Sequence, residues 1–204
     1  MLSPSSAIIQ DIFTRMSGLA SLAFFYCDFR EDLKKDLRGL LSSLLVQLCG
    51  QSNAYCAILS GFYVAHGRGS QYASDIELLR CFKDMVEVPG QAPTYIIVDA
   101  LDECPTTTGL PSPRDKVLEF VKDIVKSQIP NLRICVTSRL EADIGLVLDP
   151  LIFGSISLHT ESGQARDIAE YVKFVVETDP KMRVWRAVDK ELVIETLKRK
   201  ADGM

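Results

Sequence analysis

The sequence has few of the residues that usually mark a metal or thiol site. Only 2 of its 204 residues are His, and they lie far apart. The six Cys form no C-x-x-C pair, and several lie in strongly apolar stretches. Reduced cysteine behaves there as a small core residue. We therefore expect a reducing, cytoplasmic environment.

Basic residues and long apolar runs are also scarce. The formal net charge is −4, so no positive field favours nucleic acid or an anionic membrane as a partner. The longest helical apolar run, LRGLLSSLLVQLC at residues 37–49, is too short to span a bilayer. The N-terminus lacks the charged start and cleavage site of a signal peptide. We expect neither a nucleic-acid partner nor a membrane association.

The residues that are present predict a globular α/β fold. Hydrophobic residues make up 47% of the chain, enough for one sizeable core. Helical periodicity or capping residues predict helices at 5–16, 35–49, 54–64, 74–87, 115–127, 163–179 and 187–204. Apolar runs predict strands at 19–29, 94–98, 132–137 and 151–158, the last weakened by Gly154. Apolar strands separated by helices favour a parallel sheet between two helical layers.

Polar residues collect where these strands end. Asp28 ends the first apolar run, and Asp99 follows the second, with Asp102 and Glu103 just beyond it. Ser138 and Arg139 follow the third strand. Because ligands of parallel sheets bind at the carboxyl ends of the strands, these residues predict a single site.

The carboxylates are chemically suited to a cation and a water molecule. An Asp held at a strand end can bind Mg²⁺, and a further carboxylate can orient water for attack on phosphorus. Two other interpretations stay open: a solvated acidic turn, and a metal-dependent phosphohydrolase that uses Asp28 with Asp99, Asp102 and Glu103. Arg139 is suited to a phosphate and equally to a structural ion pair.

Two of these stretches resemble a known family. YIIVDALDEC at 95–104 and RICVTSR at 133–139 resemble the NACHT domain of fungal STAND and NOD-like receptor proteins, which are similar to the nephrocystin-3 N-terminal region. Residues 19–48 and 192–204 fit the same pattern. The resemblance implies a three-layer P-loop NTPase-like fold over 1–204, with 188–204 beginning a further helical region.

The resemblance also implies roles for the site residues. Asp99 is expected to act on Mg²⁺, Asp102 and Glu103 to lie near the attacking water, and Arg139, beside Ser138, to sense the terminal phosphate of ATP. In the family, ADP holds a closed form and ATP permits oligomerisation. Effector domains precede such domains, and ankyrin or WD-type repeats follow them, in proteins of innate immunity and heterokaryon incompatibility.

One family element is missing from the sequence. The G-x-x-x-x-G-K-[ST] loop that cradles phosphates is absent, because none of the 12 Gly precedes Lys. We therefore expect a chain truncated before this loop and its strand, with weak or no ATP or GTP hydrolysis of its own. The alternative is a non-catalytic interaction or scaffold module. Loss of an interior strand further predicts either a shift of the last strand into the gap or a marginally stable domain.

Overall fold

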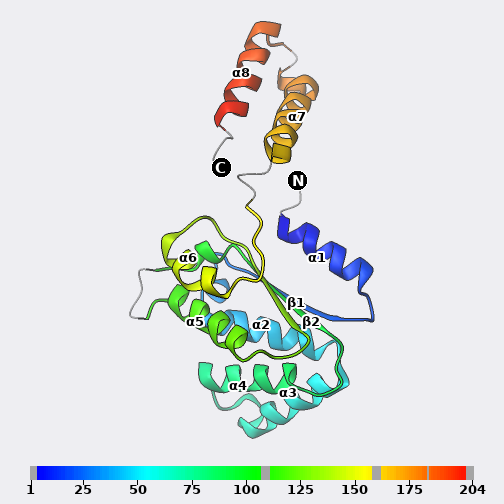
Figure 1. The fold of residues 1–204 in the computed structure, drawn as a ribbon, viewed down its shortest axis with the longest axis vertical. Helices are drawn as coiled ribbons and strands as arrows, with labels where there is room; N and C mark the ends of the chain where they lie inside the picture. The colour runs from blue at the N-terminus through cyan, green and yellow to red at the C-terminus, as the bar shows by residue number, and fades with distance from the viewer. Residues whose placement is uncertain (1–3, 107–110, 158–161, 183, 201–204) are drawn as a thin grey trace. The chain divides into compact units, whose positions relative to one another are not determined.

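The computed structural model describes residues 4–106, 111–157, 162–182 and 184–200. These fall into two compact units, Met1–Leu151 and Ile152–Met204, which are taken one at a time. The helices and strands of the first unit are α1 (Pro4–Arg15), β1 (Ser21–Tyr26), α2 (Leu37–Cys49), α3 (Asn53–Ala65), α4 (Asp75–Val86), β2 (Thr94–Asp99), α5 (Pro113–Lys126), β3 (Leu132–Val136) and α6 (Ala142–Leu148). Short 3₁₀ helices η1 (Asp32–Lys34), η2 (Gly67–Gly69), η3 (Leu101–Glu103) and η4 (Asp149–Leu151) connect them. Figure 1 shows their course.

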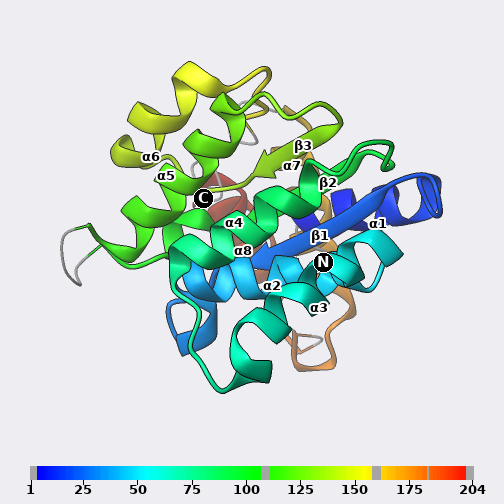
Figure 2. The same cartoon turned by 90° about the horizontal axis from the view of Figure 1, so that it is seen from below.

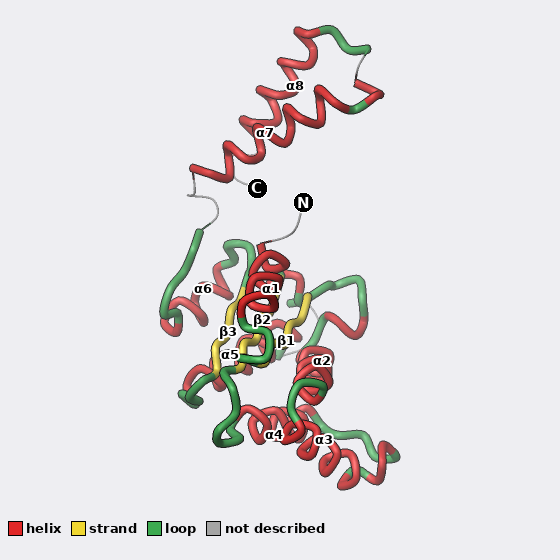
Figure 3. Tube along the Cα trace, turned by 90° about the vertical axis from the view of Figure 1, so that its right-hand side faces the viewer, coloured by secondary structure: helices red, strands yellow, loops and turns green. Residues whose placement is uncertain are grey.

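The three strands form a parallel sheet in the order β1-β2-β3. Figure 3 shows them side by side with β2 in the middle. In the register, Ala23 lies opposite Ile96 and Phe25 opposite Val98, so these residues share one face. All four are buried in a common core with α2, α4 and α5. The α/β fold with helices flanking a parallel sheet is therefore confirmed.

The opposite face of the sheet is also covered. Leu22 and Ile97 alternate with the core residues along β1 and β2, and both are buried. Helix α1 packs against these two strands. Burial on both faces explains why the strand sequences are apolar throughout rather than alternating. Figure 2 shows the same unit from below, with α3 and α4 nearest the viewer.

The free edge of β1 is capped by two glutamine side chains, Gln47 of α2 and Gln51 just after the end of that helix. The Gln51 amide accepts a hydrogen bond from Leu22 N–H (2.8 Å) and donates to its carbonyl oxygen (2.6 Å). Gln47 makes the same two bonds with Phe24, at 3.0 and 2.7 Å. An uncovered edge strand exposes such groups to pairing with other chains. The two glutamines therefore act as a substitute for a neighbouring strand.

The strand expected at 151–158 is wrong for the residues that are described. Leu151 ends η4, residues 152–157 carry no strand, and Leu158 lies outside the described residues. Ile152, Phe153 and Ile156 are exposed. An apolar run forms a strand only where an edge pairs with it, and Gly154 weakens this run further. In the described part of the chain, the outer edge of β3 therefore has no neighbouring strand, and a shift of this segment does not fill it.

The second unit contains two helices in contact with each other, α7 (Ser162–Thr178) and α8 (Ala187–Lys200). The 3₁₀ helix η6 (Pro180–Met182) lies between them in the chain. Both terminal helices are as expected, apart from residues 201–204, which are not described. The start of a separate helical region at 188 stays a prediction. No helix in the described ranges has both the length and the apolar composition needed to cross a bilayer.

Candidate functional site

The expected polar residues lie at one edge of the sheet. Tyr26 at the end of β1 is opposite Asp99, the last residue of β2, so Asp28 lies two residues beyond the strand end that neighbours Asp99. Val98 is opposite Val136, which places Ser138 and Arg139 beyond the end of β3. Because the strands are parallel, their carboxyl ends form a single edge.

Asp99 is held by a residue that the sequence patterns did not single out. The Thr137 hydroxyl donates to Asp99 Oδ1 and accepts a hydrogen bond from Ala100 N–H at 3.0 Å. Backbone hydrogen bonds from Thr137 N–H to Val98 O (2.9 Å) and from Leu101 N–H to Thr137 O (2.9 Å) extend the ladder past both strands. Thr137 therefore fixes one carboxylate oxygen of Asp99 and leaves Oδ2 to other partners.

The backbone turns sharply between Asp99 and the next two acids. Ala100 adopts φ 54° and ψ 48°, the left-handed region, which costs a residue with a Cβ about 1 kcal/mol or more. Leu101 is fully buried and anchors the following 3₁₀ turn. Such strained positions persist where the surroundings fix them, and they cluster at functional sites. We name residues 99–104 the acidic turn.

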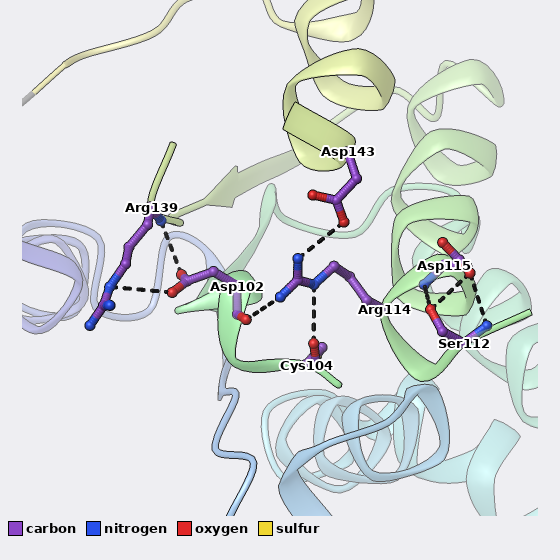
Figure 4. Close-up of polar contacts among 7 residues, drawn as sticks. All are labelled: Asp102, Cys104, Ser112, Arg114, Asp115, Arg139 and Asp143. Atoms are coloured by element: carbon purple, nitrogen blue, oxygen red, sulfur yellow. Dashed lines mark hydrogen bonds and ion pairs between the residues drawn. The ribbon is translucent and has the colours of Figure 1, made fainter. Parts of the chain in front are cut away.

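Within the acidic turn, Asp102 is bound by Arg139. The Arg139 N–H donates to Asp102 Oδ1 at 3.0 Å, and its Nε lies 3.5 Å from Oδ2 (Figure 4). The Asp102 side chain is 11% exposed and the Arg139 side chain 84%. The structural ion pair, one of the two interpretations of Arg139, is thus formed here. Ser138 beside it is exposed.

A buried arginine holds the backbone of the acidic turn by hydrogen bonds, and sequence reasoning missed it. Arg114, in the first turn of α5, donates from Nε to the Cys104 carbonyl oxygen (3.1 Å) and from Nη2 to the Asp102 carbonyl oxygen. Its Nη1 reaches Asp143 of α6 at 3.0 Å. Figure 4 shows the guanidinium between these three acceptors. Only the tertiary fold brings residues 102, 104 and 143 around it, so no local pattern could have indicated the role.

The remaining charged residues of the edge form a second pair. Arg30 binds Asp28 through Nε (2.9 Å) and Nη2 (3.0 Å). This bond and a backbone bond from Arg30 N–H lower the pKa of Asp28. The hydrogen bond to Asp28 is the main cause that raises the pKa of Arg30, and the charge of Glu103 adds a smaller contribution. Asp28 is therefore committed to Arg30, which disfavours its use in a phosphohydrolase site.

Two buried thiols lie behind the acidic turn. Cys27 follows β1 and donates its N–H to the Asp99 carbonyl oxygen at 2.9 Å. A hydrogen bond to Cys104 and burial raise the pKa of the Cys27 thiol, and the same bond, with the charge of Arg114, lowers that of Cys104. Both side chains are almost fully buried. The pair fills the core between β1 and the turn.

The site residues fit a hard cation better than they fit phosphates. Asp99 offers a carboxylate oxygen, a ligand that Mg²⁺ prefers. In the described ranges, however, no three His, Cys, Asp or Glu side chains group as a metal site. The arginines near this edge, Arg30, Arg114 and Arg139, each already pair with an aspartate. The acidic side of a nucleotide site is present. None of these three arginines is left unpaired to bind phosphates.

The fold and the site together define a class of protein. A parallel sheet between helices, with acids and an arginine gathered at the carboxyl edge, is the arrangement of three-layer P-loop-like domains. A family model described as "Nephrocystin 3, N-terminal" matches residues 4–139, which is more than half of the chain. The chain belongs to this family. The matched range includes the acidic turn and ends at Arg139. Neither a curated protein nor a solved structure matches the chain.

Proposed function

We propose that this chain is the acidic half of an ATP/ADP-binding switch domain of the NACHT type. The observation that carries the proposal is the convergence of Asp99, Asp102 and Arg139 at one sheet edge, where Arg114 and Thr137 hold the acidic turn by hydrogen bonds. Family membership over residues 4–139 supports it. By itself the chain is expected to hydrolyse ATP weakly or not at all, since it contains no Gly-Lys pair.

Each residue of the edge has a role in this proposal. Asp99 would hold Mg²⁺ through the oxygen that Thr137 leaves unbonded. Asp102 and Glu103 would orient the attacking water, and Arg139 with Ser138 would contact the terminal phosphate. Bound Mg²⁺ would neutralise charge on the phosphate oxygens. For Arg139 to reach a phosphate it must leave Asp102, which would couple nucleotide binding to the geometry of the acidic turn.

A graft tests the proposal. A strand and a G-x-x-x-x-G-K-S loop are fused ahead of residue 4, and a fluorescent ATP analogue is titrated into the original and grafted chains with Mg²⁺. We expect micromolar binding only by the grafted chain, because the loop supplies the missing cationic and backbone donors. If the graft folds, as judged by circular dichroism, and still fails to bind, the acidic edge is not half of a nucleotide site.

A second candidate is a non-catalytic interaction or scaffold module derived from the same fold. The pairing of Arg139 with Asp102 favours it, because the arginine expected to contact a phosphate already has a partner without a ligand. Micromolar ATP binding by the original chain would exclude this candidate.

The surrounding assignments belong to the same proposal. A cytoplasmic protein is consistent with the free state of all six cysteine thiols. Effector and repeat domains elsewhere in a longer protein, homo-oligomerisation on ATP binding and a role in fungal immune or incompatibility signalling follow from the NACHT resemblance. Analytical ultracentrifugation of the grafted chain with ATP and with ADP tests the oligomerisation.

A further inference from the structure

His66 lies between two oxygen atoms at the start of the segment that joins α3 to α4. We name residues 66–74 the α3–α4 loop. The Nδ1 atom of His66 lies 2.9 Å from the Phe62 carbonyl oxygen, and its Nε2 atom lies 3.4 Å from Glu77 Oε1 on α4. The Phe62 ring packs against the imidazole, with 4.2 Å between the two ring centroids. The His66 side chain is 16% exposed, so the ring is held largely out of solvent.

Only a protonated histidine satisfies both oxygen atoms. A neutral imidazole carries one N–H, so its second nitrogen would turn a lone pair toward a carbonyl or carboxylate oxygen. The imidazolium donates from both nitrogens and carries the charge that attracts a carboxylate. Hydrogen bonds from Ser74 are the main cause that lowers the pKa of Glu77 to about 2, and a bond from His66 adds to them. Glu77 is therefore anionic throughout the range in which histidine gains or loses its proton.

The first half of the α3–α4 loop, residues 66–71, is built on the backbone of His66. The His66 carbonyl oxygen accepts hydrogen bonds from Gly69 N–H and Gln71 N–H, both at 3.2 Å. Between them Arg68 adopts a φ of 56°, in the left-handed region that is unfavourable for a residue with a Cβ. This conformation persists only while its surroundings hold it.

The second half of the loop is held by contacts that do not involve the imidazole. Arg38 of α2 donates from Nη2 to the Ala73 carbonyl oxygen, and its Nε lies 3.3 Å from Asp75 Oδ1 at the start of α4. Release of the His66 ring is therefore expected to loosen the first half of the loop and to leave the second half in place.

We propose that His66 and Glu77 form a pH-sensitive contact, which holds the first half of the α3–α4 loop while His66 is protonated and releases it when His66 is neutral. At mildly acidic pH the imidazolium binds both oxygen atoms, and the loop keeps the conformation described. As the pH rises, the ring loses one proton and with it one of the two bonds. The stabilising effect is thus full at mildly acidic pH and is lost as the pH rises through neutrality.

The other titratable or charged side chains near His66 keep their charge over this range. Arginine, aspartate and tyrosine side chains ordinarily stay in one charge state between about pH 5 and pH 8. Those near His66 are Arg38 of α2, Tyr63 of α3, whose ring lies against Gly69, Arg68 of η2, and Asp75 and Arg80 of α4. A change of the loop across this range is therefore assigned to His66.

Hydrogen exchange of the full chain at about pH 5.5 and about pH 8 tests the proposal. Each amide is expressed as a protection factor, because the intrinsic exchange rate itself rises with pH. The protection factors of Gly69 and Gln71 N–H should fall by about two- to fivefold between the two pH values, the size of one solvent-screened ion pair. Leu78 N–H, which donates to the Ser74 carbonyl oxygen at 3.0 Å, is the internal reference and should not change.

Three variants assign the fall to the two side chains. His66→Gln removes the titratable ring and should give equal protection at both pH values. Glu77→Gln removes the charge, while a glutamine there can still complete the capping box of α4, and the fall should shrink clearly. Glu87→Gln, which removes an exposed carboxylate at the other end of α4, should behave like the wild type.

Nitrogen-15 NMR of the imidazole reports its protonation directly. The chain contains two histidines, so His159→Gln leaves His66 as the one source of the signal. We expect protons on both ring nitrogens at the lower pH and on one at the higher pH, with loop protection following the same titration. Protection that does not change with pH, a fall retained in His66→Gln, a fall undiminished in Glu77→Gln, or an equal fall at Leu78 would each overturn the proposal.

Discussion

Replacing Arg114 with alanine should destabilise the first unit strongly. The side chain is 10% exposed and donates to two backbone carbonyl oxygens of the acidic turn as well as to Asp143. A buried acceptor that loses its only charged donor costs about 1 to 3 kcal/mol. With two such acceptors, and an ion pair whose Asp143 side chain is 44% exposed and adds little, we expect a loss of about 2 to 5 kcal/mol in the free energy of unfolding.

Urea denaturation followed by far-UV circular dichroism measures this loss. The single Trp, Trp185, belongs to the second unit and not to the unit that contains the acidic turn. Arg80→Ala is the matched control, because Arg80 is an exposed arginine on helix α4, and it should change stability by at most about 0.5 kcal/mol. A cost below about 1 kcal/mol for Arg114→Ala would refute the view that Arg114 supports the turn.

Three further changes test the local chemistry. Thr137→Val removes the hydroxyl between Asp99 and Ala100 and should cost about 1 to 3 kcal/mol by urea denaturation, whereas Thr137→Ser should cost clearly less; equal costs would contradict the hydroxyl's role. Ala100→Gly relieves a φ of 54° and should gain about 0.5 to 1 kcal/mol, so a destabilised variant would show that the turn is unstrained. Hydrogen bonds from Ser74 lower the pKa of Glu77 from 4.5 to about 2, so its stabilising effect is full above pH 4.5 and is lost as the pH falls toward 2. The melting temperature of Glu77→Gln should therefore fall less steeply than that of the wild type as the pH is lowered from 4.5 to about 2. Parallel profiles of melting temperature against pH would contradict the assignment.

The sheet and the position of the site could be predicted because their signals are local. Runs such as residues 95–98 are apolar or aromatic throughout, which only a strand covered on both faces requires. Once the strands are parallel, Asp28, Asp99 and Arg139 must share an edge. The acidic cluster follows from this rule alone.

The contacts that hold the site could not be predicted, because they join distant parts of the chain. Arg114 reaches Asp143 on α6, and Gln47 reaches β1, without any pattern in their neighbours. The wrong prediction of a strand at residues 152–157 has a related cause. Apolar composition indicates that a segment can be a strand, but the availability of a pairing edge is a property of the whole fold.

In the part of the chain that the structure describes, the outer edge of β3 has no neighbouring strand, and this bears on stability. Uncovered ladder groups favour either marginal stability or association. The domain should therefore melt no higher than ordinary mesophilic domains. Differential scanning calorimetry measures this, and a much higher melting temperature would contradict it.

The measurement that tests the central claim most directly is the affinity of the grafted chain for ATP with Mg²⁺, with Asp99 intact and with Asp99→Asn. If Asp99 holds the cation, the substitution should weaken binding by about tenfold or more with Mg²⁺ and have little effect when EDTA replaces it. Equal affinities for the two grafted proteins in Mg²⁺ would contradict the assignment of the acidic edge as half of a nucleotide site.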